Sequence, residues 1–323
     1  MSALHKKFPG VEVGGSSSMK SSNIGGQAVM EGVMMRNADK YAVAVRKTDG
    51  EIVVKTEEYK GIVQNKKIRS LPIIRGVFSF IDSMVLGMST LTYSASFFMD
   101  EEEEEKDEKK ESVMMGLTIA CSVVMAVAIF MILPYFLSQL FRKFTDSTTL
   151  ITLLEGAVRL VIFFGYILLI SRMKDIQRVF MYHGAEHKCI NCVEHGLELN
   201  VENVMKSSRE HKRCGTSFLL FVMIVSIIFF LFIRVSSPVL RVVIRLLLMP
   251  VIAGVSYEII RLAGKSDNKI VALLSKPGLM LQHLTTREPE PEMAEVAIAA
   301  VEAVFDWRSY LKENFPEQYG EKS

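Results

Sequence analysis

Long apolar stretches dominate the centre of the chain and set its architecture. Residues 112–141 and 214–233 contain no charged side chain at all. About 20 consecutive apolar residues are enough to cross the hydrocarbon core of a bilayer. Two further apolar stretches are weaker because each carries a few charges. The pattern therefore predicts four membrane spans, near 113–133, 150–171, 214–233 and 239–260.

The charges inside the two weaker spans are compatible with crossing. Glu155 and Arg159 are four residues apart, so they can pair on one helix face. Arg241, Arg245 and Glu258 lie toward the ends of the last span, where long side chains can reach the interface. We interpret Glu155 and Arg159 as a packing pair, because no line of intramembrane charge continues from them.

The N-terminal part of the chain has a different pattern. Residues 1–24 are polar and rich in Gly and Ser, which is typical of a flexible segment. Residues 41–46 and 51–55 are β-prone runs on either side of Asp49-Gly50, a pair that favours a tight hairpin turn. We therefore expect a small β-rich unit over residues 25–70.

Residues 71–99 are mostly apolar but include Arg75, Asp82 and many small side chains. We interpret them as an interfacial or re-entrant helix. An acidic linker follows over 100–112. The connection at 171–213 carries eight Lys and Arg residues, whereas the one at 138–149 carries two. Since Lys and Arg concentrate on the cytoplasmic side, both termini and the 171–213 loop are expected there, which four spans over 113–261 allow.

The C-terminal tail, 262–323, contains an apolar stripe at helical spacing within 291–314. It predicts an amphipathic helix that packs on the N-terminal unit or lies on the bilayer. The expected fold is thus an α-helical integral membrane protein with four transmembrane helices. A small cytoplasmic α/β cap would be built from its N- and C-terminal regions.

Composition narrows the possible functions. A net charge of +2 and the lack of a basic patch argue against a nucleic-acid partner. A mean hydropathy of +0.26 fits a lipid bilayer as the surroundings. The first thirty residues hold no long apolar run, so we expect no cleavable signal peptide. Four cysteines without such a signal do not suggest a disulfide scaffold.

His183, Glu186 and His187 are the strongest chemical signal. The two histidines are four residues apart on the apolar face of a predicted helix, in the inverted zinc-protease pattern His-x-x-Glu-His. Two imidazoles one turn apart can bind a divalent metal, with zinc preferred, and Glu186 could act as the general base on bound water.

A third ligand is needed, because catalytic zinc usually takes three protein donors. His211, Cys214 and Glu258 are the candidates, with His211 preferred and Glu258 next. One alternative is a structural site made by Cys189, Cys192, His211 and Cys214. The other alternative is a metal-free hydrogen-bond network that ties the loop to the membrane face.

Five separated motifs carry a family resemblance: GGQAVMEGVMMRN from Gly25, YHGAEH from Tyr182, INC from Ile190, RCGTSF from Arg213 and QHLTTREP from Gln282. Over about residues 23–310 the chain resembles the YqhQ family of bacterial multi-pass membrane proteins. The resemblance implies a cytoplasmic-membrane protein, often labelled a metal-dependent enzyme, with His183, Glu186, His187, His211 and Cys214 at motif positions.

Two hypotheses for function follow. One is a metal-dependent hydrolase with its site at the cytoplasmic membrane face, which would cleave a peptide, lipid, or small amide or ester. The other is a non-enzymatic membrane scaffold whose cap binds a cytoplasmic protein and whose His, Glu and Cys cluster is structural. The sequence does not fix the oligomeric state.

Overall fold

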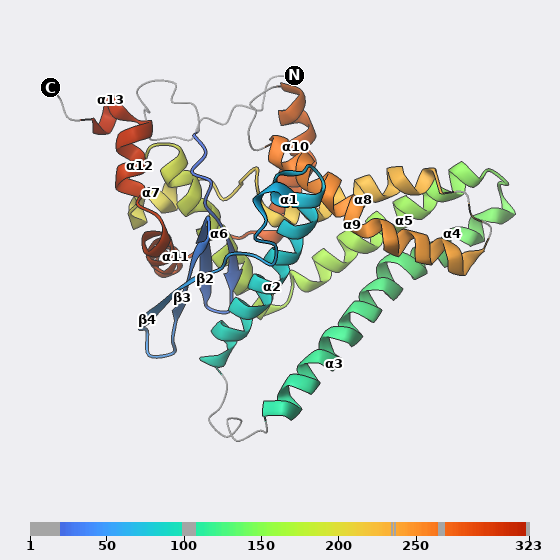
Figure 1. The fold of residues 1–323 in the computed structure, drawn as a ribbon, viewed down its shortest axis with the longest axis horizontal. Helices are drawn as coiled ribbons and strands as arrows, with labels where there is room; N and C mark the ends of the chain where they lie inside the picture. The colour runs from blue at the N-terminus through green and yellow to red at the C-terminus, as the bar shows by residue number, and fades with distance from the viewer. Residues whose placement is uncertain (1–19, 99–107, 234, 236, 264–268, 321–323) are drawn as a thin grey trace.

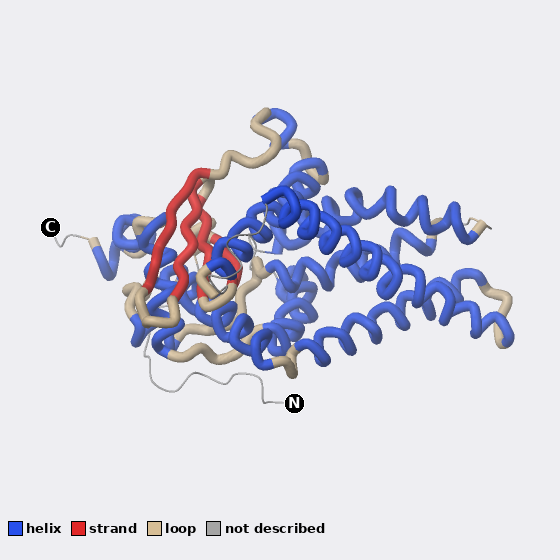
Figure 2. Tube along the Cα trace, turned by 90° about the horizontal axis from the view of Figure 1, so that it is seen from below, coloured by secondary structure: helices blue, strands red, loops and turns tan. Residues whose placement is uncertain are grey.

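The computed structural model describes residues 20–98, 108–233, 235, 237–263 and 269–320. Most of the predicted flexible segment 1–24 and the acidic part of the linker, 100–107, lie outside the described residues. The fold has two parts (Figures 1 and 2). A sheet with its covering helices lies at one end, and long helices extend from it to the other end.

The sheet is a four-stranded antiparallel meander, and its strand order follows the chain. Its strands are β1(Gly25–Val29), β2(Gly32–Asn37), β3(Lys40–Arg46) and β4(Ile52–Glu58). The predicted hairpin is confirmed, since β3 and β4 pair around the Asp49-Gly50 turn, where Gly50 has a φ of 89°.

Helices cover both faces of the sheet, because its strands alternate apolar residues on the two sides. Val33 and Met35 of β2 belong to a core shared with α6(Lys174–Glu194) and α11(Pro291–Val304). Met34, between them, packs with Leu86 of α2(Ile74–Ser96) on the opposite face. The burial of both faces explains why the first four residues of β2, Gly32 to Met35, carry no polar side chain.

The predicted tail helix packs on the sheet rather than on a separate surface. Its amphipathic stretch is divided into α11 and α12(Trp307–Asn314), with Asp306 capping the second helix. A short helix, α13(Pro316–Tyr319), follows. The cap is therefore built from both ends of the described chain, as the sequence predicts.

The hydrophobic part contains helices of membrane-spanning length. Helices α5, α8 and α9 pack together, and α4 lies against α5 (Figure 1). The bounds of these helices are α3(Glu108–Val127), the π-helix η2(Ala128–Ile132), α4(Leu133–Gln139), the 3-10 helix η3(Leu140–Lys143), α5(Thr148–Ile170), α8(Gly215–Leu231) and α9(Pro238–Ala263). The remaining helices are α1(Lys66–Ser70), α7(Val201–Lys206) and α10(Lys269–Thr285).

Four helices among the described residues are long and apolar enough to cross a membrane: Ile74–Ser96, Val113–Lys143, Thr148–Ile170 and Pro238–Leu262. This set differs from the four predicted spans. It includes residues 74–96, whereas Gly215–Leu231 is a shorter apolar helix of 17 residues. In the apolar window of Val113–Lys143 only 6% is buried by the rest of the protein, which fits a helix surrounded by lipid.

Helix α2 is one continuous helix, so the described chain has no re-entrant turn between Ile74 and Ser96. Its Asp82 side chain is buried and accepts hydrogen bonds from the Tyr59 hydroxyl and the Ile62 amide, at 3.1 and 2.8 Å. These contacts attach α2 to the segment that follows the sheet. Its position in the interface stays a prediction, because its length would also allow it to cross.

Arg245, in the last predicted span, does not lie where the sequence predicts. Glu155 and Arg159 do pair, as predicted, at 3.0 Å. Arg245 does not reach the interface: it is 2% exposed and binds the same Glu155 carboxylate. A buried carboxylate attracts a guanidinium more strongly than the distant interface does, since few other counter-charges exist between apolar helices.

Candidate metal centre

His183 and His187 lie one turn apart on α6, with ring centroids 4.4 Å apart. Their Nδ1 atoms lie 2.8 Å from the Thr285 carbonyl oxygen and 2.7 Å from that of Arg209, respectively. A carbonyl oxygen only accepts hydrogen bonds, so each Nδ1 must carry the proton. In the neutral form of each ring the lone pair is therefore on Nε2, the usual state of a metal-binding histidine.

Cys214 supplies a third donor beside these rings. It caps the N-terminus of α8, where its Sγ accepts a hydrogen bond from the Thr216 amide at 3.4 Å. The same Sγ lies 3.2 Å from Nε2 of His183. One ligand atom from each of His183, His187 and Cys214 lies within 4.8 Å of the other two. The three side chains can therefore converge on one cation.

The charges of this cluster favour a thiolate. Burial by itself would raise the pKa of Cys214, but the adjacent His183 and His187 outweigh it and hold that pKa well below its usual range. Burial likewise opposes a charge on His183, yet the Cys214 thiolate raises the pKa of His183 to about 9. A thiolate is the form of cysteine that binds metals, and a bound cation would displace the imidazole proton.

Glu186 lies between the histidines and is almost completely buried, at 4% exposure. One of its carboxyl oxygens, Oε2, has no hydrogen-bond partner among the described residues. Burial raises the pKa of Glu186, although His187 and His183 oppose the shift. The carboxyl also interacts with the backbone amide of Gly26. A buried carboxyl oxygen without a partner is costly unless a ligand or water satisfies it.

Two glycines allow distant segments to approach this helix. A Cβ on Gly26 would lie 2.3 Å from the Met34 carbonyl oxygen and 3.3 Å from Cδ of Glu186. A Cβ on Gly184 would lie 2.0 Å from the Arg287 carbonyl oxygen. Only glycine permits such close backbone contacts. The motifs that begin at Gly25, Tyr182 and Gln282 therefore meet at α6, because Gly26 and Gly184 allow the close contacts.

The structure places the other predicted ligands differently. His211 is buried near the cluster, 5.8 Å from His187 between ring centroids, but its Nε2 lies 3.3 Å from Glu194. Glu258 is outside the cluster, because it forms an ion pair with Arg75 of α2. The side chain of Glu258 is partly exposed, and the Arg75 guanidinium holds it at the end of α9. The third donor in the described chain is thus Cys214 rather than the preferred His211 or Glu258.

The cysteines of the alternative structural site do not gather at the cluster either. Cys189 and Cys192 belong to the apolar core between α6 and the sheet. The Sγ of Cys192 lies 3.3 Å from the Glu198 carbonyl oxygen, on the far side of the helix from the histidines. Position on the helix thus separates them from Cys214.

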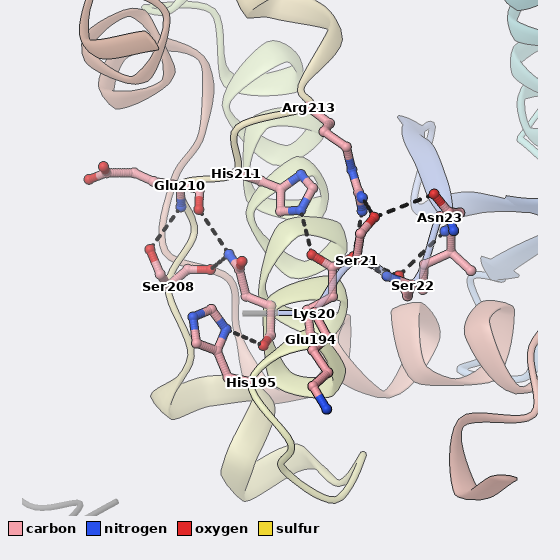
Figure 3. A network of polar contacts seen from close by, with 12 residues as sticks. Lys20, Ser21, Ser22, Asn23, Glu194, His195, Ser208, Glu210, His211 and Arg213 are labelled. Atoms are coloured by element: carbon pink, nitrogen blue, oxygen red, sulfur yellow. Dashed lines mark hydrogen bonds and ion pairs between the residues drawn. The ribbon is translucent and has the colours of Figure 1, made fainter. Parts of the chain in front are cut away.

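Glu194 is a residue that the sequence reasoning missed. It accepts hydrogen bonds from the amide and hydroxyl of Ser22, both at 2.7 Å, and from Arg213 (Figure 3). Nε2 of His211 also lies within hydrogen-bond distance of the Glu194 carboxylate. Glu194 therefore joins the start of the described chain to the segment that leads to Cys214. One glutamate at a helix end gives no sequence signal of this role.

Gln282 of α10 holds the same segment from the other side. Its side chain accepts from the His211 amide and donates to the His211 carbonyl oxygen, both at 2.8 Å. It also donates to the Ser217 hydroxyl at 2.9 Å. This clamp explains why the motif that begins at Gln282 accompanies the one that contains Cys214.

A cavity of about 350 Å³ gives access to the cluster. Its lining includes His183, Glu186, His187 and Cys214 together with residues 24–28. Such a volume is at the lower end of pockets that hold small ligands. The donors are therefore within reach of a small molecule or of one group of a larger substrate.

A family model and a relative each match most of the chain. A family model described as "Protein of unknown function (DUF1385)" matches residues 71–307. The "Uncharacterized protein YqhQ" of Bacillus subtilis (strain 168) is 36% identical over 300 residues, which cover 90% of this chain and 94% of that protein. No solved structure matches the chain. The resemblance inferred from the motifs is confirmed.

Proposed function

The chain belongs to the DUF1385 family, and we propose that it is a metal-dependent hydrolase whose centre lies at the cytoplasmic membrane face. One observation carries the proposal. Backbone carbonyls bind Nδ1 of both His183 and His187, which leaves both Nε2 atoms directed to the same place as the Cys214 thiolate. Orientation of ligating histidines through the second nitrogen is typical of metal centres.

The donor set suits zinc. Two imidazoles and one thiolate are the borderline-soft ligands that zinc prefers, and catalytic zinc sites commonly use three protein donors. Donors around one zinc ion at about 2.0–2.3 Å lie roughly 3.3–3.8 Å apart in a tetrahedron. The donors here lie within 4.8 Å of one another, so small side-chain rotations would complete the site.

Each residue then has a distinct role. Zinc held here would supply Lewis acidity and would lower the pKa of water. His183, His187 and Cys214 hold the cation, and the cavity leaves one side open for substrate. Glu186 accepts a proton from the attacking water through Oε2, which has no hydrogen-bond partner among the described residues. The Gly26 amide holds the carboxyl in place. A carboxyl with a raised pKa is well suited to take up and return that proton.

The substrate reaches the centre past β1. A second cavity of about 640 Å³ shares residues 24–27, Arg213 and Gly215 with the first. Its lining adds Arg36, Arg69 and Arg261. The combined space is large enough for part of a peptide or a lipid headgroup beside the scissile bond.

Metal analysis of the purified full chain tests the proposal. We expect about one zinc per chain in the wild type and none in the His183→Ala, His187→Ala double variant. Glu186→Gln should keep the metal but lose hydrolysis of any ester or amide that the wild type cleaves. A folded wild type that binds no divalent metal would refute the proposal.

A cysteine hydrolase is a second candidate, favoured by one contact. The Cys214 thiolate at the N-terminus of α8 lies 3.2 Å from His183, which is the geometry of a nucleophile and its base. Iodoacetamide separates the two. A metal-bound thiolate would react only after a chelator removes the metal, whereas a free nucleophile would react at the same rate with or without the chelator.

A further inference from the structure

A cluster of three buried charges lies far from the metal centre, between α5, α8 and α9. Arg159 and Arg245 both bind the carboxylate of Glu155, at 3.0 and 2.9 Å. All three are at most 5% exposed. Two guanidinium groups face one carboxylate, so the cluster carries an excess positive charge inside a group of apolar helices.

The two guanidinium groups find only some of the partners that their charge and N–H groups require. Ser226 of α8 accepts a hydrogen bond from Arg159 at 3.0 Å. The Phe230 ring lies 4.9 Å from the guanidinium of Arg159 and 4.5 Å from that of Arg245. The Nε atoms of both arginines are buried and have no hydrogen-bond partner among the described residues. An unbalanced charge in such surroundings is strongly unfavourable unless a counter-ion accompanies it.

A cavity of about 520 Å³ adjoins the cluster, and Arg159 is part of its wall. The other walls are almost entirely apolar and come from α2, α3, η2, α5, α8 and α9. No residue in the lining is acidic. The π-helix η2 contributes Phe130 and Met131, and π-turns within α-helices occur frequently at functional sites.

We propose that this cavity binds a single-chain anionic amphiphile, such as a long-chain fatty acid. Its acidic head would pair with Arg159 and balance the excess charge. Its alkyl chain would lie against the apolar walls between α2 and η2. Entry from the lipid phase suits this site, because the helix that carries η2 is almost unburied. The proposal does not depend on the metal centre.

Binding to the full chain in nanodiscs of neutral phosphatidylcholine tests this inference. The ligands are radiolabelled palmitate, hexadecyl phosphate and hexadecanol, which differ in the head alone. Arg159→Met is the main variant, because it leaves Glu155 and Arg245 as a balanced pair. Arg241→Met is the matched control on α9, since Arg241 contacts the Val235 carbonyl and Tyr135 and does not line the cavity.

Palmitate or hexadecyl phosphate should bind the wild type saturably, and the preference between them identifies the head group. Hexadecanol should bind at least about tenfold more weakly, and Arg159→Met should lower the affinity for the preferred anion by about tenfold, while Arg241→Met leaves it unchanged. Equal binding of hexadecanol, or unchanged anion binding by Arg159→Met, would overturn the inference.

If Arg159→Met does not fold, Ala126→Trp provides the test. Ala126 is exposed on α3 and lines the cavity, so the larger ring should block the chain, and unchanged binding would again overturn the inference.

Discussion

Nδ1 of His183 lies 2.8 Å from the carbonyl oxygen of Thr285, although 102 residues separate them in the chain. This hydrogen bond fixes the orientation of the His183 ring. Its acceptor, Thr285, is the last residue of α10 and belongs to the motif that begins at Gln282. The next residues strengthen it, because the Arg287 amide donates to the Phe180 carbonyl oxygen at 2.8 Å. The motifs around His183 and Thr285 therefore both contribute to the site.

Gln282→Ala should weaken the metal centre without unfolding the protein. Gln282 holds both backbone polar groups of His211, three residues before Cys214. Its loss should let the thiolate move, and changes around metal ligands typically lower affinity by about 10–100-fold. Zinc affinity measured by competition with a chromogenic chelator checks this. Gln177→Ala, in the first turn of α6, removes a hydrogen bond to the Ser171 carbonyl oxygen and should leave the affinity unchanged.

Gly26→Ala should destabilise the cap and disturb Glu186. The new Cβ would lie 2.3 Å from the Met34 carbonyl oxygen, so β1 must move away from β2. We expect a loss of about 1–3 kcal/mol in the free energy of unfolding. Gly25→Ala is the control, because nothing lies within 4 Å of its Cβ, and it should change stability by less than about 0.5 kcal/mol. Equal melting temperatures for the two variants would contradict the close approach.

The sequence predicted the elements that depend on local patterns. Strands β3 and β4, the apolar helices and the helix with His183 and His187 all follow from periodicity and turn chemistry. The burial of α11 on the sheet also agrees with its apolar stripe. Each of these features depends on a pattern of residues that lie close together in the sequence.

The contacts across the chain were not predictable in the same way. Cys214 rather than His211 joins the histidines because Glu194 and Gln282 hold His211 elsewhere, and neither residue carries a local signal. The carbonyl oxygens of Thr285 and Arg209 are backbone groups that every residue possesses. Arg245 reaches Glu155 because of helix packing that periodicity alone does not determine.

Glu194 should make stability depend on pH. Burial acts to raise its pKa, but His211 and Arg213 outweigh burial and lower the pKa from 4.5 to about 2. An acid with a lowered folded-state pKa stabilises the fold above its unfolded value and loses that contribution as pH falls through the folded value. Between about pH 4.5 and 2 the wild type should therefore lose about 3 kcal/mol relative to Glu194→Gln.

Thermal unfolding over this pH range, followed by circular dichroism in detergent, measures the difference. Glu194→Gln should be less stable than the wild type at pH 7, and its deficit should shrink on acidification. The exposed Glu317→Gln serves as the control and should run parallel to the wild type. A deficit that stays constant from pH 7 to pH 2 would show that Glu194 does not titrate as this network requires.

Orientation in the membrane gives a last prediction. The loop near Phe144 and the loop near Glu198 lie at opposite ends of the protein in Figure 1, and both residues are exposed. Eight Lys and Arg residues lie within 171–213 against two within 138–149, so the loop with Glu198 should be cytoplasmic. In a Cys121→Ser background the remaining native cysteines are buried, and that background without a new cysteine measures any labelling of Cys214. A membrane-impermeant maleimide should then label Phe144→Cys in intact cells but Glu198→Cys only after permeabilisation. Labelling of Glu198→Cys in intact cells would place the metal centre outside and exclude a cytoplasmic substrate.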